Sequence, residues 1–312
     1  MPNWCANKIE VTGPESALQV FLAKCAPVVN DDQATERVLK MLLAGMAGYL
    51  QPVRTIEGKL KLSGPYGEFT WLPAENSGRV CEPNEAYTVL LELLADDAYL
   101  THNVIQQVDD LYRKSGVANI LFTGIDRNRR RLLKKVMKAV HFDHRGFLGR
   151  MNVERFWISM GVVTRAVDSE RPFSFTQFAP EKLLVAVNGF NGRLFDGISD
   201  GYHGNCDRFG TKWDACDAVI EQMDDRVTID FDTAWSPPEP VVTKMAMGQP
   251  ELMIEYFFAE QGMNYCGYRA YEHGQCFDSS DDSLEMSFVD EDGCCDVIGP
   301  DYVVNNLSNY GG

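Results

Sequence analysis

Residues 226–235 constrain the fold most, because apolar and polar side chains alternate along this segment. Such alternation is typical of a strand with one buried side and one solvent-exposed side. Two tryptophans, Trp213 and Trp235, lie in the surrounding stretch, residues 209–238. Because a large aromatic side chain needs a large apolar pocket to be buried, we expect both tryptophans to anchor a hydrophobic core. The stretch therefore indicates the fold rather than the chemistry.

Strand-like segments occur at both ends of the chain, and helix-like segments lie between them. Residues 7–12 alternate and predict a strand that is followed by a helix. From residue 31 to residue 150 most apolar residues recur at helical spacing. Because one strand and one helix cannot bury their apolar faces alone, we predict an α+β domain, residues 1–30 plus 156–312, interrupted by a mostly helical insertion domain, residues 31–155. Three consecutive modules are the alternative.

The second half of the chain has further strand signals. Residues 251–260 and 265–274 are rich in apolar and aromatic side chains, and they predict two more strands. Residues 173–178 alternate and predict another strand. Residues 156–164 fit either a strand or a buried helix.

The overall charge of the chain is strongly negative. The 312 residues include 45 Asp and Glu against 29 Lys and Arg, a formal net charge of -16. This balance argues against general binding of nucleic acid or anionic membranes by the whole surface. No apolar run approaches the roughly 18 residues of a membrane helix, and the first residues lack a secretory signal pattern. With nine scattered cysteines, we expect reduced thiols, a cytoplasmic location and no membrane partner.

Five segments occur together in an informative order. They are MPNWCANKIEVTG, FSFTQFAP, FGTKWDACD, FDTAWSPP and AEQGMNYCGYRAYEHG. This series resembles the Api-ninety-two-like family of phage and plasmid proteins, over residues 1–25 and 170–275. The resemblance implies a ferredoxin-like antiparallel sheet core of β-α-β-β-α-β type and residence in a mobile element of a bacterial host cell. Trp213, Asp214 and Trp235 fall on these motifs, but the resemblance implies no catalytic residues and no function for the insertion.

The most concentrated basic segment is residues 126–142. Its apolar residues fall on one side of a predicted helix, and its basic residues fall on the other. The candidate residues for binding a partner protein or nucleic acid are Arg129, Arg130, Arg131, Lys134, Lys135 and Lys138. Basic side chains near a helix N-terminus oppose the helix dipole by up to about 1 kcal/mol, so we expect a negative group nearby. Nucleic acid, a protein partner and the chain's own acidic segments are candidates, and a solvated helix face is the simplest interpretation.

Residues 278–296 form an acidic, serine-containing segment. The candidate acidic partner-binding residues are Asp281, Asp282, Glu285, Asp290, Glu291 and Asp292. An acidic surface of this kind can occupy the DNA-binding groove of another protein by charge complementarity. The alternative is a solvated acidic loop.

Two His-x-x-Cys tetrads stand apart in the sequence. They provide His203 with Cys206 and His273 with Cys276, which are the ligand types of a tetrahedral zinc site. The glycine after each histidine instead predicts ordinary turns between strands. We therefore predict no metal site and no cofactor.

The sequence provides no recognised catalytic motif. Two carboxylate pairs, Asp214 with Asp217 and Asp230 with Asp232, have spacings that suit metal-assisted hydrolysis. However, the alternation in 226–235 places Asp230 and Asp232 on the solvent-exposed side of a strand. We assign no catalytic residue.

The sequence thus predicts a cytoplasmic protein that binds a host macromolecule, with a host protein favoured and a role against host defence as the extended hypothesis. Nucleic-acid binding through residues 127–138 is the alternative. An unrecognised metal-dependent hydrolase is the second alternative. The oligomeric state is left open.

Overall fold

The computed structural model describes residues 3–27, 31–56, 61–62, 78–145, 151–162, 171–286 and 297–311. The chain divides into two compact units. Unit 1 comprises Met1–Pro27, Ser169–Ala179 and Asn205–Gly312, and unit 2 comprises Val28–Asp168 and Pro180–Gly204. Both units are therefore discontinuous. The predicted domain boundaries differ most over Pro180–Gly204, which groups with the helical unit rather than with the sheet.

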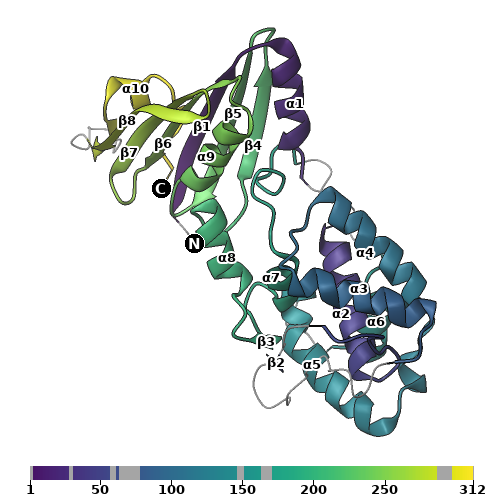
Figure 1. Ribbon diagram of the computed structural model, residues 1–312. Helices are drawn as coiled ribbons and strands as arrows, with labels where there is room; N and C mark the ends of the chain where they lie inside the picture. Colours follow the sequence, from purple (N-terminus) through teal and green to yellow (C-terminus); the bar gives the residue numbers. More distant parts are fainter. Residues whose placement is uncertain are drawn as a thin grey trace. The chain divides into compact units, whose positions relative to one another are not determined.

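Unit 1 contains a six-stranded antiparallel sheet (Figure 1). Its strands are β1 (Trp4–Thr12), β4 (Cys216–Gln222), β5 (Arg226–Ala234), β6 (Met253–Glu260), β7 (Tyr265–Glu272) and β8 (Gln275–Ser283), in the order β4-β5-β1-β6-β7-β8. β1 is central, since Lys8 pairs with Asp230 of β5 on one side and with Phe257 of β6 on the other. Together with α1 (Glu15–Cys25) and α9 (Glu239–Gly248), the strands β1, β4, β5 and β6 follow the predicted β-α-β-β-α-β order. The α+β, ferredoxin-like prediction is confirmed.

The period-2 pattern of β5 places its side chains as the sequence predicts. Val227, Ile229 and Phe231 are at most 4% exposed and belong to one core that also contains apolar residues of α1 and α9. Asp230 and Asp232 lie on the opposite face of the sheet and are half-buried. One face of this part of the sheet is therefore apolar and covered by helices, and the other is polar.

The other face of β6 and β7 is covered by a smaller core. Phe257, Ala259 and Cys266 pack there with Val303 of α10 (Asp301–Val304) and with Leu307. Two short strands, β9 (Glu285–Met286) and β10 (Val297–Ile298), pair next to it. Residues 275–283, which the sequence left unassigned, form the edge strand β8.

Unit 2 is mainly helical, as predicted for the insertion. Its elements are α2 (Asp31–Met46), α3 (Glu82–Ala95), α4 (His102–Ser115), η3 (Val117–Asn119), η4 (Phe122–Gly124), α5 (Arg127–Arg145), α6 (Val153–Ser159), α7 (Leu183–Asn188) and the paired short strands β2 (Lys61–Leu62) and β3 (Phe195–Asp196). A single apolar core joins the helices and contains Leu39, Leu90 and Trp157, each fully buried. α8 (Gly201–Phe209) contains the boundary between the units.

Two local predictions need correction. Residues 173–178 form turns rather than a strand, because the Asp214 carboxylate accepts hydrogen bonds from the Phe175 N–H (2.7 Å) and the Ser174 hydroxyl (2.6 Å). A side chain thereby replaces the strand partner that this backbone would need. Of the ambiguous segment 156–164, the residues up to Ser159 belong to the helix α6, residues 160–162 form a turn, and residues 163–164 lie outside the described residues. No helix in the described part of the chain is long and apolar enough to cross a membrane.

Candidate functional site

The tryptophans expected in the core are on the surface. The side chain of Trp213 is 37% exposed and that of Trp235 is 47% exposed, whereas Phe209 of the same stretch is buried. The prediction that both tryptophans anchor a core is therefore wrong. Together with three neighbours they form what we call the aromatic surface of unit 1, which consists of Trp4, Lys212, Trp213, Trp235 and Met263.

Lys212 connects the tryptophan rings. Its Nζ lies 4.1 Å from the ring centroid of Trp213 and 5.7 Å from that of Trp235. The Trp4 and Trp213 ring centroids are 6.2 Å apart, with the rings tilted by 47°. Each exposed cation–π contact contributes about 0.5–1 kcal/mol, so the lysine restrains both rings while they remain accessible to solvent.

The backbone of Trp235 has an unusual conformation. Its φ is 75°, in the left-handed region that bulky residues avoid at a cost of about 1–2 kcal/mol. The Trp235 N–H donates to the Asn3 carbonyl at 3.0 Å, and the Trp235 carbonyl accepts from the Tyr265 hydroxyl at 2.8 Å. Residues held in such conformations concentrate at functional sites, where the surrounding structure compensates the strain. The geometry therefore singles out Trp235 within the surface.

Further hydrogen bonds hold the two tryptophan-bearing segments together. The Ser236 hydroxyl donates to the Gly210 carbonyl (2.6 Å), and the Thr211 hydroxyl donates to the Ala234 carbonyl (2.7 Å). Gly210 has φ 82°, and a Cβ there would lie 2.7 Å from Cδ of Pro240, so the close approach requires glycine. The surface is thus built on a fixed backbone.

The turn between β6 and β7 adds Met263, whose side chain is 67% exposed. The buried carboxylate of Glu260 accepts from the N–H groups of Gly262 (2.8 Å) and Met263 (2.7 Å). The turn lies against Asn3, since a Cβ on Gly262 would meet the Asn3 side chain. Asn3 precedes Trp4 and bonds to Trp235, so the turn that carries Met263 lies beside the backbone of the tryptophan-bearing segments.

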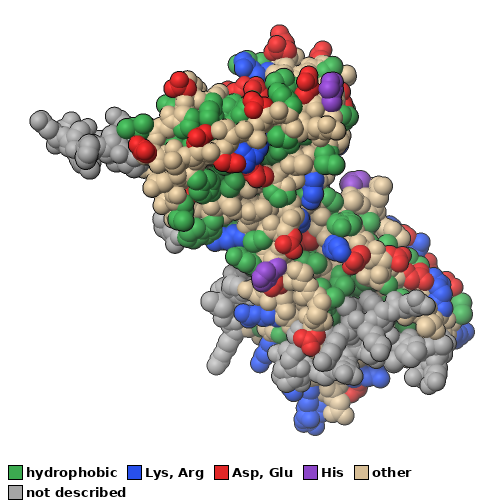
Figure 2. Space-filling view, turned by 60° about the vertical axis from the view of Figure 1, so that its left-hand side comes forward, with side chains coloured by type: hydrophobic (Ala, Val, Ile, Leu, Met, Phe, Trp, Pro, Cys, Tyr) green, Lys and Arg blue, Asp and Glu red, His purple; other side chains and the backbone are tan. Residues whose placement is uncertain are grey.

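The two units differ in net charge. Unit 1 contains 8 Lys and Arg against 25 Asp and Glu, a net formal charge of −17, whereas unit 2 contains 21 against 20, a net of +1. Figure 2 shows acidic side chains on the visible face of unit 1. Burial raises the pKa of Asp230 and Asp232, and the neighbouring Asp217 adds to the increase for Asp232. Unit 1 is therefore the source of the acidity of the whole chain.

Three of the six predicted acidic residues lie among the described residues. Asp281 lies on β8 and pairs with Arg269 at 2.7 Å, and the Asp282 carboxylate accepts from the Tyr302 hydroxyl. Burial is the first cause that raises the pKa of Tyr302, to about 12, and the bond to Asp282 contributes. Glu285 begins β9. The remaining three predicted residues, Asp290, Glu291 and Asp292, lie outside the described residues.

The basic segment forms the helix α5, with the predicted amphipathic character. Leu133, Val136, Met137 and Val140 are at most 1% exposed. Five of the six predicted residues are exposed: Arg129, Arg131, Lys134, Lys135 and Lys138. Arg130 is half-buried.

Arg129 has a structural contact. Its side chain pairs with Asp126 and donates to the Ala47 carbonyl. The Asp126 carboxylate also accepts from the N–H groups of Asn128 (2.9 Å) and Arg129 (3.3 Å). Asp126 is thus an acidic group at the helix N-terminus, where the opposing charge was expected.

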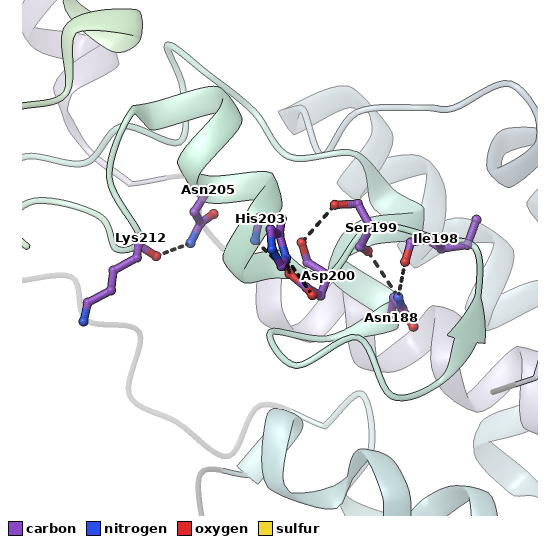
Figure 3. A network of polar contacts seen from close by, with 7 residues as sticks. All are labelled: Asn188, Ile198, Ser199, Asp200, His203, Asn205 and Lys212. Carbon is purple, nitrogen blue, oxygen red and sulfur yellow. Dashed lines mark hydrogen bonds and ion pairs between the residues drawn. The ribbon is translucent and has the colours of Figure 1, made fainter. Parts of the chain in front are cut away.

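The His-x-x-Cys residues belong to different environments. His203 and Cys206 lie on α8, where the Asp200 carboxylate accepts from the His203 N–H at 2.7 Å and contacts the imidazole Nδ1 at 2.8 Å (Figure 3). Gly204 is therefore helical, and its prediction as a turn glycine is wrong. Farther along α8, the Asn205 amide donates to the Lys212 carbonyl at 2.8 Å and fixes the backbone of the aromatic surface.

His273 and Gly274 form the tight turn before β8, both with positive φ, and Cys276 follows on the strand. Among the described residues, no group of three or more His, Cys, Asp or Glu side chains can hold a metal ion. Burial also raises the pKa of the Cys5 thiol to about 12, which leaves it protonated and unreactive near neutral pH.

Two family models match the chain. Residues 27–213 match a protein family of unknown function, DUF1281, and residues 208–301 match the ferredoxin-like domain of Api92-like proteins. The chain belongs to the DUF1281 family. The resemblance predicted from the five sequence segments is confirmed, and the family model also covers the helical unit, for which the sequence provided no motif.

Two similar proteins extend these findings. The uncharacterized protein YubB of Escherichia coli K12 is 34% identical over 145 residues, which are 45% of this chain and 99% of YubB. The crystal structure of a protein api92 from Yersinia pseudotuberculosis has a TM-score of 0.72 and 23% identity, covering 91% of this chain and 99% of that one. At this identity the second likeness shows a shared fold.

Proposed function

We propose that this protein binds another protein, and that the aromatic surface of unit 1 contacts a partner with a basic face. The observation that carries the proposal is Trp235, which is half-exposed and held at φ 75° by hydrogen bonds on both sides of its backbone. A strained backbone that exposes an indole to solvent does not improve the packing of the core. It does hold the indole rigidly in place for contact with a partner.

The composition of the surface supports a protein partner. Tryptophan, methionine and other large side chains are enriched at protein interfaces, and tryptophan is enriched among the residues that dominate binding energy. Lys212 restrains the Trp213 and Trp235 rings before any partner arrives. Less side-chain entropy is then lost on binding, which increases affinity.

The charge of unit 1 supports a basic partner. With 25 acidic against 8 basic residues, the unit attracts positively charged surfaces and repels acidic ones and nucleic acid. The predicted family setting extends the proposal to a host protein, and a basic nucleic-acid-binding protein of host defence fits the same charge. This extension rests on the family resemblance, and identification of the partner tests it.

The test is affinity purification of the tagged full-length chain from bacterial host lysate, followed by mass spectrometry. Three samples are compared: the unchanged chain, a Trp213→Ala/Trp235→Gly variant, and a Phe277→Ala control. Phe277 is another exposed aromatic residue of unit 1, 58% exposed on β8 and outside the aromatic surface.

We expect a basic protein that the unchanged chain and the control retain and the double variant loses. The partner should elute at a lower salt concentration when acidic residues of unit 1 are replaced by neutral ones, because ions screen the attraction between charged surfaces. Equal retention by all three samples would show that the aromatic surface is not the contact. A retained partner with an acidic surface would contradict the charge argument.

A further inference from the structure

The basic face of α5 is a second charged surface, independent of the aromatic surface. Residues 127–138 contain seven Lys and Arg and no Asp or Glu. Six of the seven are exposed, and five of these remain when Arg129, which pairs with Asp126, is set aside; they lie on the side opposite the buried apolar residues. We call these five the basic stripe: Arg127, Arg131, Lys134, Lys135 and Lys138. Figure 2 shows Lys and Arg side chains on the part of unit 2 that contains α5.

The stripe is not neutralised within the described part of unit 2. Asp126, the acidic residue at the helix start, pairs with Arg129, which lies outside the stripe. None of the ion pairs found among the described residues involves a stripe residue. Elsewhere in unit 2 the basic residues Arg113 and Lys114 pair with Asp110, as is common for exposed charges. The stripe therefore differs from Arg113 and Lys114 of α4.

The spacing of the stripe fits a line of phosphates. Arg127, Arg131, Lys134 and Lys138 follow at intervals of four, three and four residues, so they form one row along the helix. At 1.5 Å per residue this row is about 17 Å long. Four or five cations in a row can each neutralise one phosphate of a nucleic-acid backbone and release its counterions.

We propose that the basic stripe of α5 binds the phosphate backbone of double-stranded DNA without sequence preference. An α-helix fits the wide major groove of B-form DNA, whereas the major groove of A-form RNA is too narrow for it. Residues 127–138 contain no aromatic side chain to stack on unpaired bases, which disfavours single strands. The acidity of unit 1 opposes association, and salt weakens this repulsion, since the screening length is about 10 Å at 0.1 M.

The test measures binding of the full-length chain to a fluorescent DNA duplex as a function of salt concentration. The stripe variant is Arg131→Gln/Lys134→Gln. The matched control is Arg113→Gln/Lys114→Gln, which removes one Arg and one Lys from α4 of the same unit. Glutamine preserves helix propensity, and circular dichroism verifies that each variant folds.

We expect the stripe variant to reduce the slope of log K against log salt by about 2 and to weaken binding about 50-fold at 0.1 M salt. The control should change binding less than threefold. Absence of duplex binding at 50 mM salt, or equal losses in both variants, would overturn the proposal. Equally tight binding of single-stranded DNA or duplex RNA would overturn the assignment to duplex DNA. Because the stripe and the aromatic surface lie in different units, either proposal can fail without the other.

Discussion

The two units each bury a charged side chain, and they support it in different ways. In unit 1 the carboxylate of Glu260 is fully buried and accepts two backbone hydrogen bonds in the turn that presents Met263. In unit 2 the ammonium-bearing side chain of Lys40 is 2% exposed, over the rings of Tyr112 and Trp157. The first charge is satisfied by N–H groups and shapes a surface turn, whereas the second is held mainly by aromatic faces inside a helical core. A buried charge in this protein is thus supported by whichever groups the local fold provides.

The largest expected effect tests whether the two units unfold independently. Ile229 is fully buried in the core of unit 1, and Leu39 is fully buried in the core of unit 2. Ile229→Ala and Leu39→Ala should each lower the free energy of unfolding of their own unit by about 3 kcal/mol. Urea unfolding followed by hydrogen exchange with mass spectrometry assigns each loss to a unit. If both substitutions destabilise both units equally, the two cores unfold as one.

A smaller effect concerns the buried lysine. Burial lowers the pKa of Lys40 to about 8, whereas the unfolded chain retains the ordinary value of 10.5. Between about pH 8 and 10.5 the unfolded state binds more protons, so the stability of unit 2 should rise with pH in this window. The rise should be on the order of 2 kcal/mol, and Lys40→Met should abolish it.

The matched control for this prediction is Lys135→Met, which removes an exposed ammonium from α5. Thermal unfolding of the three proteins at pH 7.5 and 10 provides the comparison. The same pH dependence in the Lys40→Met variant as in the unchanged chain would show that Lys40 is not the titrating group.

The smallest effect tests the strain at Trp235. Glycine adopts positive φ without a steric penalty, and alanine does not. We therefore expect Trp235→Gly to be more stable than Trp235→Ala by about 1 kcal/mol, although glycine is normally the less stable replacement. Chemical unfolding of both variants measures the difference. A more stable alanine variant would mean that residue 235 does not keep its left-handed conformation.

The sequence predicts those elements whose period is visible in their own residues. The alternation of β5 and the amphipathic pattern of α5 both arise from contacts with a core on one side, so the local sequence is enough to predict each element. Segment 173–178 alternates in the same way, yet it forms turns because Asp214, about 40 residues away, satisfies its backbone. A distant side chain of this kind leaves no trace in a local pattern.

The exposed tryptophans were missed for a related reason. Continued alternation along β5 would place residue 235 on the buried side with Phe231 and Thr233. The left-handed turn at Trp235 interrupts the alternation and redirects the side chain to solvent. The lysine beside Trp213 was an available signal, since an ammonium is attracted to the face of an indole. Trp4 and Met263 adjoin the site only through the folded sheet and had no signal of their own.

The central position of β1 has a consequence for synthesis on the ribosome. Lys8 of β1 pairs with Asp230 and Phe257, more than 200 residues later in the chain. At about 5–20 residues per second, β1 and α1 are made roughly 10–40 seconds before either neighbouring strand exists. Unit 2 is complete before β4 is translated, because its last residue is Gly204. During this interval the apolar residues of β1 lack their partner strands, and the sheet cannot form until β5 and β6 emerge.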